Sequence, residues 1–205
     1  MGQQYDPRNV FTAMHHEVTS ELLHLMDGFY SNIEDALFEL AYRNNDEAQQ
    51  GRCFDLMREM RFRRSNLIQT FARRMQRTVQ YWFNDSVPYD EHNTELEIVA
   101  KGMSEKCAAH FKLLLQNIAE RTAYGTGRDI KNIQLPISPY SIAYQFVCSC
   151  RSLEFDRDSI EIVQELFARF VLDRLGGVYG DCNQRLGDAG YGTLEELEGT
   201  TIISA

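Results

Sequence analysis

The arginine side chains of residues 52–77 are the groups in this sequence whose type and spacing are best suited to chemistry. Eight arginines lie in this segment against two acidic residues, Asp55 and Glu59, which gives a local charge of +6. Since the whole chain of 205 residues has a formal net charge of −9, the remaining residues carry −15. A guanidinium group has a planar fork of N–H donors that fits phosphate and carboxylate groups. The segment is therefore a candidate site for an anion or an acidic protein surface.

Four of these arginines are expected to lie along one side of a helix. At about 100° per residue, Arg52, Arg63 and Arg74 fall within about 40° of one another, and Arg77 lies close to them. The apolar residues of the segment, Phe54 among them, occupy another sector and are expected to face the core. We call Arg52, Arg63, Arg74 and Arg77 the arginine stripe. They are the candidate residues for binding an anion or a partner.

The stripe has an alternative interpretation, in which its charge is matched inside the fold. Acidic residues that could face it occur in two other predicted helices: Glu34, Asp35 and Glu39 in one, and Glu154, Asp156, Asp158, Glu161 and Glu165 in the other. With so many carboxylates in the chain, internal or partner charge matching is favoured over binding of an external anion. Nucleic acid is disfavoured as a ligand because polyanion binding needs a net basic face.

The stretch HHEVTSELLH contains a spacing that is typical of metal ligands. Glu21 and His24 have the Glu-x-x-His spacing of di-iron bundles, which need a second such pair on another helix. No second pair occurs, because the residues three positions before His110 and His92 are Cys107 and Tyr89. We therefore expect no metal site, and we interpret Glu17, Glu21 and His24 as a solvated helix face.

The sequence also predicts no catalytic residues and no cofactor. The pattern YGTGRDI lacks the third glycine of a dinucleotide fingerprint and follows a predicted helix, so it indicates a helix end and a loop. No serine or cysteine lies in a nucleophile motif. The five cysteines are an odd set without a C-x-x-C pair, which is typical of reduced thiols. No apolar run of about 20 residues and no signal peptide is present, so we expect a cytoplasmic chain.

The elements that position these residues are expected to be helices. Apolar residues recur at helical spacing along almost the whole chain, and no segment has a sustained period of two. This predicts an all-α fold, an antiparallel bundle of about five to seven helices with one long central helix. The central helix is expected over about Glu47–Asn84, which at about 1.5 Å per residue is roughly 50 Å long. It carries the arginine stripe.

The other helices are bounded by capping signals and glycines. A first helix is expected over about Asn9–Asp27, with Gly28 breaking or bending the chain. The predicted starts of later helices are Ser31 with Glu34, Thr94 with Glu97, Ser138 with Pro139, and Asp158 with Glu161. The helix from Thr94 is expected to run past Ile118, and the last one carries inward residues as far as Tyr179. We expect one helical domain over 1–190, with 191–205 as a frayed tail or a truncated link to a downstream region.

Four segments carry a resemblance to a known family. They are SNIEDALFELAYRNNDEAQQGRCFDLMREMRFRR, VPYDEHNTELEIVAKGMSEK, NIQLPISPYSIAYQF and ELFARFVLDRLGGVYGDCNQRL. In this order they resemble the N-terminal region of a bacterial family of long cytoplasmic proteins of unknown function, some of which have been labelled thymidine phosphorylase. The residues give that label no support. The family has no established catalytic residues to transfer to this chain.

The resemblance implies a domain of a larger protein. Some relatives are associated with cyclic-di-GMP signalling modules, which implies a regulatory role, although no arginine motif of a cyclic-di-GMP receptor maps onto this chain. The sequence thus favours a non-enzymatic helical module that binds a protein partner or a second copy of itself. The alternative is an anion-binding module that uses the arginine stripe for a nucleotide or nucleic acid.

Overall fold

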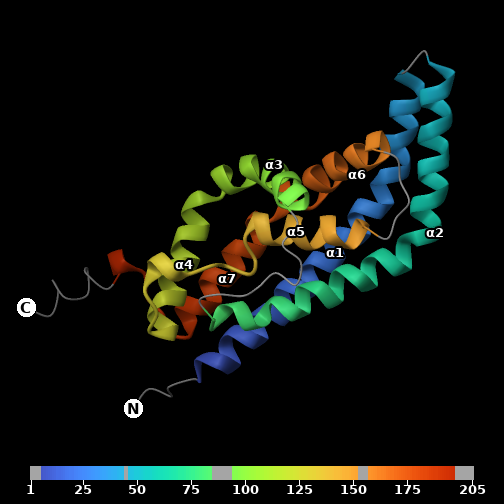
Figure 1. Ribbon diagram of the computed structural model, residues 1–205. Coiled ribbons are helices and arrows are strands. Elements are labelled where there is room, and N and C mark those ends of the chain that lie inside the picture. The colour runs from blue at the N-terminus through green and yellow to red at the C-terminus, as the bar shows by residue number, and fades with distance from the viewer. Residues whose placement is uncertain (1–5, 44–45, 85–93, 152–156, 197–205) are drawn as a thin grey trace, which may run out of the picture.

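The described parts of the protein are entirely helical. The computed structural model describes residues 6–43, 46–84, 94–151 and 157–196, which contain seven α-helices and three short 3₁₀ helices but no strand. The α-helices are α1 (Pro7–Arg43), α2 (Glu47–Arg77), α3 (Thr94–His110), α4 (Lys112–Thr126), α5 (Pro139–Cys150), α6 (Arg157–Phe170) and α7 (Gly176–Asp188). The 3₁₀ helices are η1 (Thr78–Trp82), η2 (Ile130–Asn132) and η3 (Leu172–Arg174). The predicted all-α bundle is confirmed (Figure 1).

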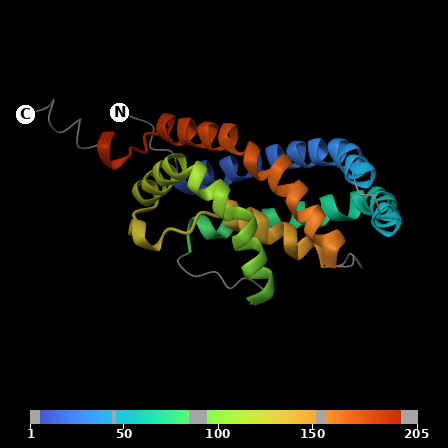
Figure 2. The same cartoon turned by 90° about the horizontal axis from the view of Figure 1, so that it is seen from above.

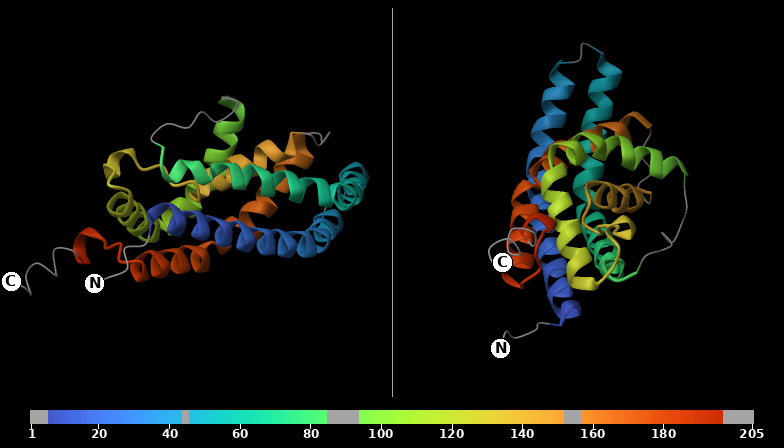
Figure 3. Two further views of the ribbon diagram at one scale, coloured as in Figure 1. Left: turned by 90° about the horizontal axis from the view of Figure 1, so that it is seen from below. Right: turned by 90° about the vertical axis from the view of Figure 1, so that its left-hand side faces the viewer.

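The two longest helices form an antiparallel hairpin that the other helices cover in part. α1 lies along α2, α3 packs against α5, and α4 packs against α7. α5 and α6 both contact the hairpin. The end of the hairpin, where α1 ends and α2 begins, projects beyond the other helices in each view (Figures 1, 2 and 3). The body of the bundle therefore leaves this end of α1 and α2 uncovered on at least one side.

α1 is a single helix of 37 residues, so the chain does not break at Gly28, and the predicted helix start at Ser31 is wrong. The Ser31 hydroxyl does not cap a helix, but donates to the carbonyl oxygen of Asp27 at 2.9 Å, one turn back. Buried Met26, Phe29 and Ile33 continue one apolar stripe through this region. Packing of that stripe compensates for the helix cost of one glycine, which is about 1 kcal/mol.

α2 and η1 together match the predicted central helix. The Asp46 carboxylate accepts a hydrogen bond from the backbone N–H of Ala48 at 2.9 Å and so caps α2, and the last turn tightens into η1. With 31 residues, α2 is nevertheless shorter than α1, which is the longest helix in the described ranges.

Two predicted helices are divided in the structure. The helix from Thr94 breaks at Phe111, and the helix from Asp158 ends at Phe170, where the chain turns through η3 into α7. Residues near the two breaks contact each other, because the Phe111 ring packs on Tyr179 with the centroids 5.7 Å apart and against Gly176, where a Cβ atom would lie 3.0 Å from the ring. The predicted start at Ser138 is confirmed by a hydrogen bond from the Ser141 N–H to its hydroxyl at 3.1 Å.

A second feature of the core is a buried polar contact between α1 and the end of α2. The Trp82 indole N–H donates to Nδ1 of His15 at 3.2 Å, and Nε2 of His15 lies 2.8 Å from the carbonyl oxygen of Met75. Because an indole N–H can only donate, Nδ1 must be unprotonated and Nε2 must carry the hydrogen. Burial lowers the pKa of the His15 imidazole below its ordinary value of 6.5, against the raising effect of the bond to Met75. The folded protein therefore holds His15 neutral.

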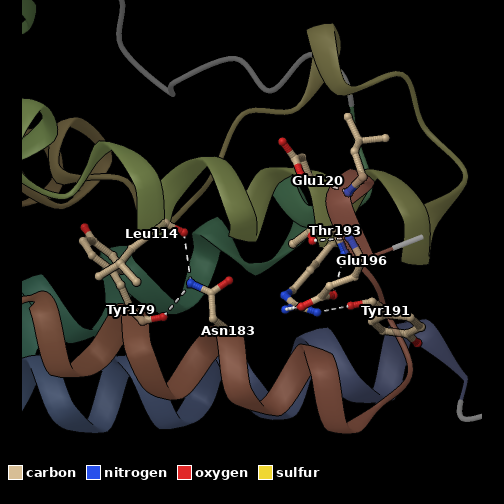
Figure 4. A network of polar contacts seen from close by, with 9 residues as sticks. Leu114, Glu120, Tyr179, Asn183, Tyr191, Thr193 and Glu196 are labelled. Carbon is tan, nitrogen blue, oxygen red and sulfur yellow. Dashed lines mark hydrogen bonds and ion pairs between the residues drawn. The ribbon is translucent and has the colours of Figure 1, made fainter. Parts of the chain in front are cut away.

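Residues 191–196 lie against α4, where hydrogen bonds join Tyr191 and Glu196 to Arg121 (Figure 4). We call these three residues with Thr193 the clasp. The buried Arg121 side chain donates to the carbonyl oxygen of Tyr191 at 2.5 Å and to the Glu196 carboxylate at 2.7 Å. Glu196 in turn accepts from the backbone N–H of Thr193 at 2.9 Å. Gly187 lets α7 approach this clasp, because a Cβ atom there would lie 3.3 Å from Nη1 of Arg121. The predicted domain limits, 1–190 and 191–205, stay a prediction.

The neutral state of His15 predicts a loss of stability on acidification. Above about pH 6.5, His15 is neutral in both the folded and unfolded states, so it adds no pH dependence. Below that pH the unfolded state binds the proton more readily, so the free energy of unfolding falls by at most about 1.4 kcal/mol per pH unit. Urea unfolding from about pH 7.5 to about pH 5.5 should show a smaller fall for His15→Gln than for the wild type. The exposed residue His24 supplies a control, His24→Gln, and equal slopes for both variants would contradict this assignment.

Two glycines of α7 should respond oppositely to alanine. Gly180 has no atom within 4 Å of the position that a Cβ would occupy, so Gly180→Ala should raise the free energy of unfolding by about 0.5–1 kcal/mol. Gly187→Ala should instead displace the Arg121 guanidinium and weaken its two hydrogen bonds, at a cost of about 1 kcal/mol or more relative to Gly180→Ala. Denaturant unfolding of both variants measures the difference. Equal gains would show that the clasp tolerates the extra methyl group.

Candidate functional site

Two residues of the arginine stripe are engaged inside the chain. Nε of Arg63 donates to the Glu59 carboxylate at 2.8 Å, one turn away on α2. Nε of Arg74 donates to the side-chain oxygen of Gln145 on α5 at 3.1 Å. Both arginines are partly buried. The Arg74 bond joins α2 to α5, whereas the Arg63 pair lies within α2, and neither guanidinium group is fully available to an external anion.

The other two residues of the stripe, Arg52 and Arg77, are exposed and make no hydrogen bond or ion pair with the residues that the structure describes. Arg52 lines a pocket of about 260 Å³ between the hairpin and α6, opposite the α6 carboxylates Asp158, Glu161 and Glu165. Arg77 lies 25 positions further along α2, which is about 37 Å away. The four arginines thus share a side of α2 but do not converge on one small ligand, and anion binding by them stays a prediction.

Arginines outside the stripe make the ion pairs between the two hairpin helices. Arg61 of α2 binds the Glu34 carboxylate of α1 with two hydrogen bonds, of 2.9 and 2.6 Å. Arg64 binds Asp27 at 3.0 Å, and its guanidinium lies over the Tyr30 ring, 5.2 Å from the centroid. The hydrogen bonds from Arg61 lower the pKa of the Glu34 carboxyl. Part of the arginine charge of residues 52–77 is therefore matched by carboxylates of α1, although through arginines that lie outside the stripe.

Three exposed aromatic side chains gather at the end of the hairpin, and we call Phe38, Tyr42 and Phe54 the aromatic cluster. The rings of Phe38 and Tyr42 lie 4.6 Å apart and those of Phe38 and Phe54 lie 6.4 Å apart, measured between centroids. Their exposed fractions are 48%, 72% and 46%. The prediction that Phe54 faces the core is therefore wrong, because no helix among the described residues covers this side of the hairpin end.

The hairpin thus has two different sides. On one side, Leu40 of α1 and Arg52 and Cys53 of α2 line the pocket that α6 closes. The aromatic cluster lies on the other side, together with the Glu34–Arg61 and Asp27–Arg64 pairs. We call this second side the open side of the hairpin. The only hint of it in the sequence is the spacing of Phe38 and Tyr42, which places both off the apolar stripe of Ile33, Leu37 and Ala41.

The remaining candidate groups have structural surroundings. All five cysteines are buried, and burial raises the pKa of the Cys107 and Cys182 thiols to about 12, so neither is a thiolate near neutral pH. Gly127, at φ +67°, ends α4 within the YGTGRDI stretch, as the sequence indicated. Glu17, Glu21 and His24 are exposed, and Glu17 pairs with Arg185 of α7.

Neither a metal site nor a membrane span is evident in the described ranges. No group of three or more metal-ligating side chains gathers in them, and none of their helices is long and apolar enough to cross a bilayer. A further pocket, of about 510 Å³, lies between α3, α5 and α6. Its walls combine apolar residues such as Leu96 and Val147 with charged residues such as Arg157 and Glu161 at the rim.

Comparison with known proteins supports the resemblance found in the sequence. The family model described as the N-terminal domain of a protein of unknown function, DUF1631, matches residues 6–88 and 89–190. Searches of curated proteins and of solved structures gave no significant match. Since the family model covers nearly all of the helices described above, the chain belongs to the DUF1631 family and carries its N-terminal domain.

Proposed function

We propose that this domain is a non-enzymatic protein-interaction module, and that the open side of the α1–α2 hairpin is its docking surface. In this proposal the domain serves a regulatory role within a larger cytoplasmic bacterial protein. The observation that carries it is the aromatic cluster, whose three rings contact one another on a projecting helix end instead of entering the core. A contiguous exposed aromatic patch is typical of protein-binding surfaces.

The chemistry of the open side suits a protein partner. Phenylalanine and tyrosine rings supply a large apolar contact area with few rotatable bonds, and tyrosine adds a hydroxyl that can hydrogen-bond at the rim. Arg61 and Arg64 lie on the same side and remain substantially exposed, at 71% and 47% of the side chain. Apolar rings at the centre and charged groups around them form the usual pattern of an interface.

A regulatory role linked to cyclic-di-GMP rests on the family resemblance alone. The alternative of anion binding is favoured by one observation, the exposure of Arg52 and Arg77 without a partner among the described residues. Their separation of about 37 Å suits an extended polyanion rather than a single nucleotide. The net charge of −9 disfavours such a ligand.

Site-specific photo-crosslinking tests the docking surface. With p-benzoylphenylalanine in place of Tyr42, irradiation of cells that produce the protein should yield a covalent adduct with another polypeptide, because docking brings the partner within contact of this ring. The same group in place of Tyr124, which is 53% exposed on α4, is the matched control and should give no such adduct. Mass spectrometry identifies the adduct. If positions 38, 42 and 54 all fail to crosslink to any protein, the hairpin end is not a docking surface.

Anion binding is tested by fluorescence polarisation with labelled cyclic-di-GMP and labelled RNA. We expect neither probe to show salt-sensitive binding, because Arg63 and Arg74 are held by Glu59 and Gln145 and the other two arginines lie far apart. Salt-sensitive binding that is lost in both Arg52→Ala and Arg77→Ala would instead favour the alternative function.

A further inference from the structure

We infer that the open side of the hairpin binds the same side of a second copy of this chain, so that α1 of each copy lies against α2 of the other. The inference rests on the proposed function and names the partner of that surface. It follows from two features of the open side that are otherwise unrelated: the separation of charge between the two helices, and the position of the aromatic cluster at one end.

Charge on the open side is sorted by helix. The acidic groups, Asp27 and Glu34, belong to α1, and the basic groups that face them, Arg61 and Arg64, belong to α2. All four side chains keep between 42% and 71% of their surface exposed, so each retains acceptor or donor positions for a further partner. A surface made of one acidic row beside one basic row is complementary to a second copy that is rotated by a half turn to face it.

Only one two-fold arrangement uses this complementarity. An axis that runs parallel to the hairpin and in front of its open side places α1 of one copy opposite α2 of the other, so acidic rows meet basic rows. An axis that runs across the hairpin places α1 opposite α1 and α2 opposite α2, so like charges meet. The charges therefore select the parallel axis.

The same axis brings the two aromatic clusters together. Rotation about an axis parallel to the hairpin keeps both hairpin ends at the same level, so Phe38, Tyr42 and Phe54 of one copy face the same three residues of the other. Six rings then cover one another, and each exposed ring loses its contact with water. An axis that runs across the hairpin brings the two clusters together only if it passes near the hairpin ends. The two hairpins then point in opposite directions, and the acidic row of one copy faces the acidic row of the other.

The contact surface between the two copies is small, and its size sets the expected affinity of the dimer. The open side from Asp27 to Tyr42 covers 16 residues of α1, which are about 22 Å from first to last, and is two helices wide. Such an area lies at or below the lower limit of stable dimer interfaces, so we expect association in the micromolar range. Figure 3 shows that the hairpin end, which carries part of this surface, projects beyond the other helices.

Charge reversal on one helix at a time tests the arrangement. The double variant Asp27→Arg with Glu34→Arg has two basic rows, and the double variant Arg61→Glu with Arg64→Glu has two acidic rows. Each alone should dimerise at least about tenfold more weakly than the wild type in sedimentation equilibrium, because like rows meet. An equimolar mixture of the two should form a heterodimer of near wild-type strength, because both of its contacts between copies regain opposite charges.

Controls separate folding, docking and self-association. Circular dichroism checks that both variants stay helical, and Lys106→Glu, which breaks an exposed ion pair to Asp173 elsewhere, should leave dimerisation unchanged. A wild-type chain that stays monomeric into the high micromolar range, or a mixture that fails to restore dimers, overturns this inference. A crosslinked adduct at position 42 with a different protein also overturns the self-association but supports the proposed docking function. An adduct of twice the chain mass supports both the self-association and the docking function.

Discussion

The rings of Phe146 and Phe167 stack with their centroids 3.6 Å apart, and Phe29 and Phe71 meet them edge-on at 6.1–6.3 Å. These four rings come from α5, α6, α1 and α2, so one contact joins the hairpin to the helices that cover it. Because α5 and α6 are held on one side of the hairpin by this contact, none of the helices in the described part of the chain covers the opposite side of its projecting end. The exposure of the aromatic cluster is thus a consequence of where the core is anchored.

The sequence predicts local structure well where a short-range contact decides it. The Ser138 cap, the glycine that ends α4 and the extent of α2 with η1 follow from side chain to backbone geometry within a few residues. The helix neither breaks at Gly28 nor starts at Ser31, because the local preference for a break competes there with a buried apolar stripe on both sides. Phe111 and Gly176 illustrate the opposite case, since these two residues are 65 positions apart and spacing along the chain does not predict that they meet.

The candidate site was predicted in part for a similar reason. Helical spacing placed Arg52, Arg63, Arg74 and Arg77 on one side of α2, and the existence of acidic partners in the preceding helix was anticipated for Glu34. Spacing alone does not tell which side of a helix remains uncovered. Phe54 was assigned to the core because periodicity assumes that a helix is packed along its whole length, whereas the end of this hairpin extends past the helices that cover it.

The pairing of Glu34 with Arg61 and of Asp27 with Arg64 matches only part of the arginine charge of α2. Exposed ion pairs of this kind contribute little to folding stability, because water and salt screen both charges. Their more consequential effect is to hold carboxylates and guanidinium groups in two separate rows, one on each helix. Ordered rows of opposite sign beside aromatic rings favour one orientation of an approaching surface, and repulsion between like rows disfavours the others. In the proposed docking, the paired arginines therefore bear on the orientation of the partner more than on the stability of the fold.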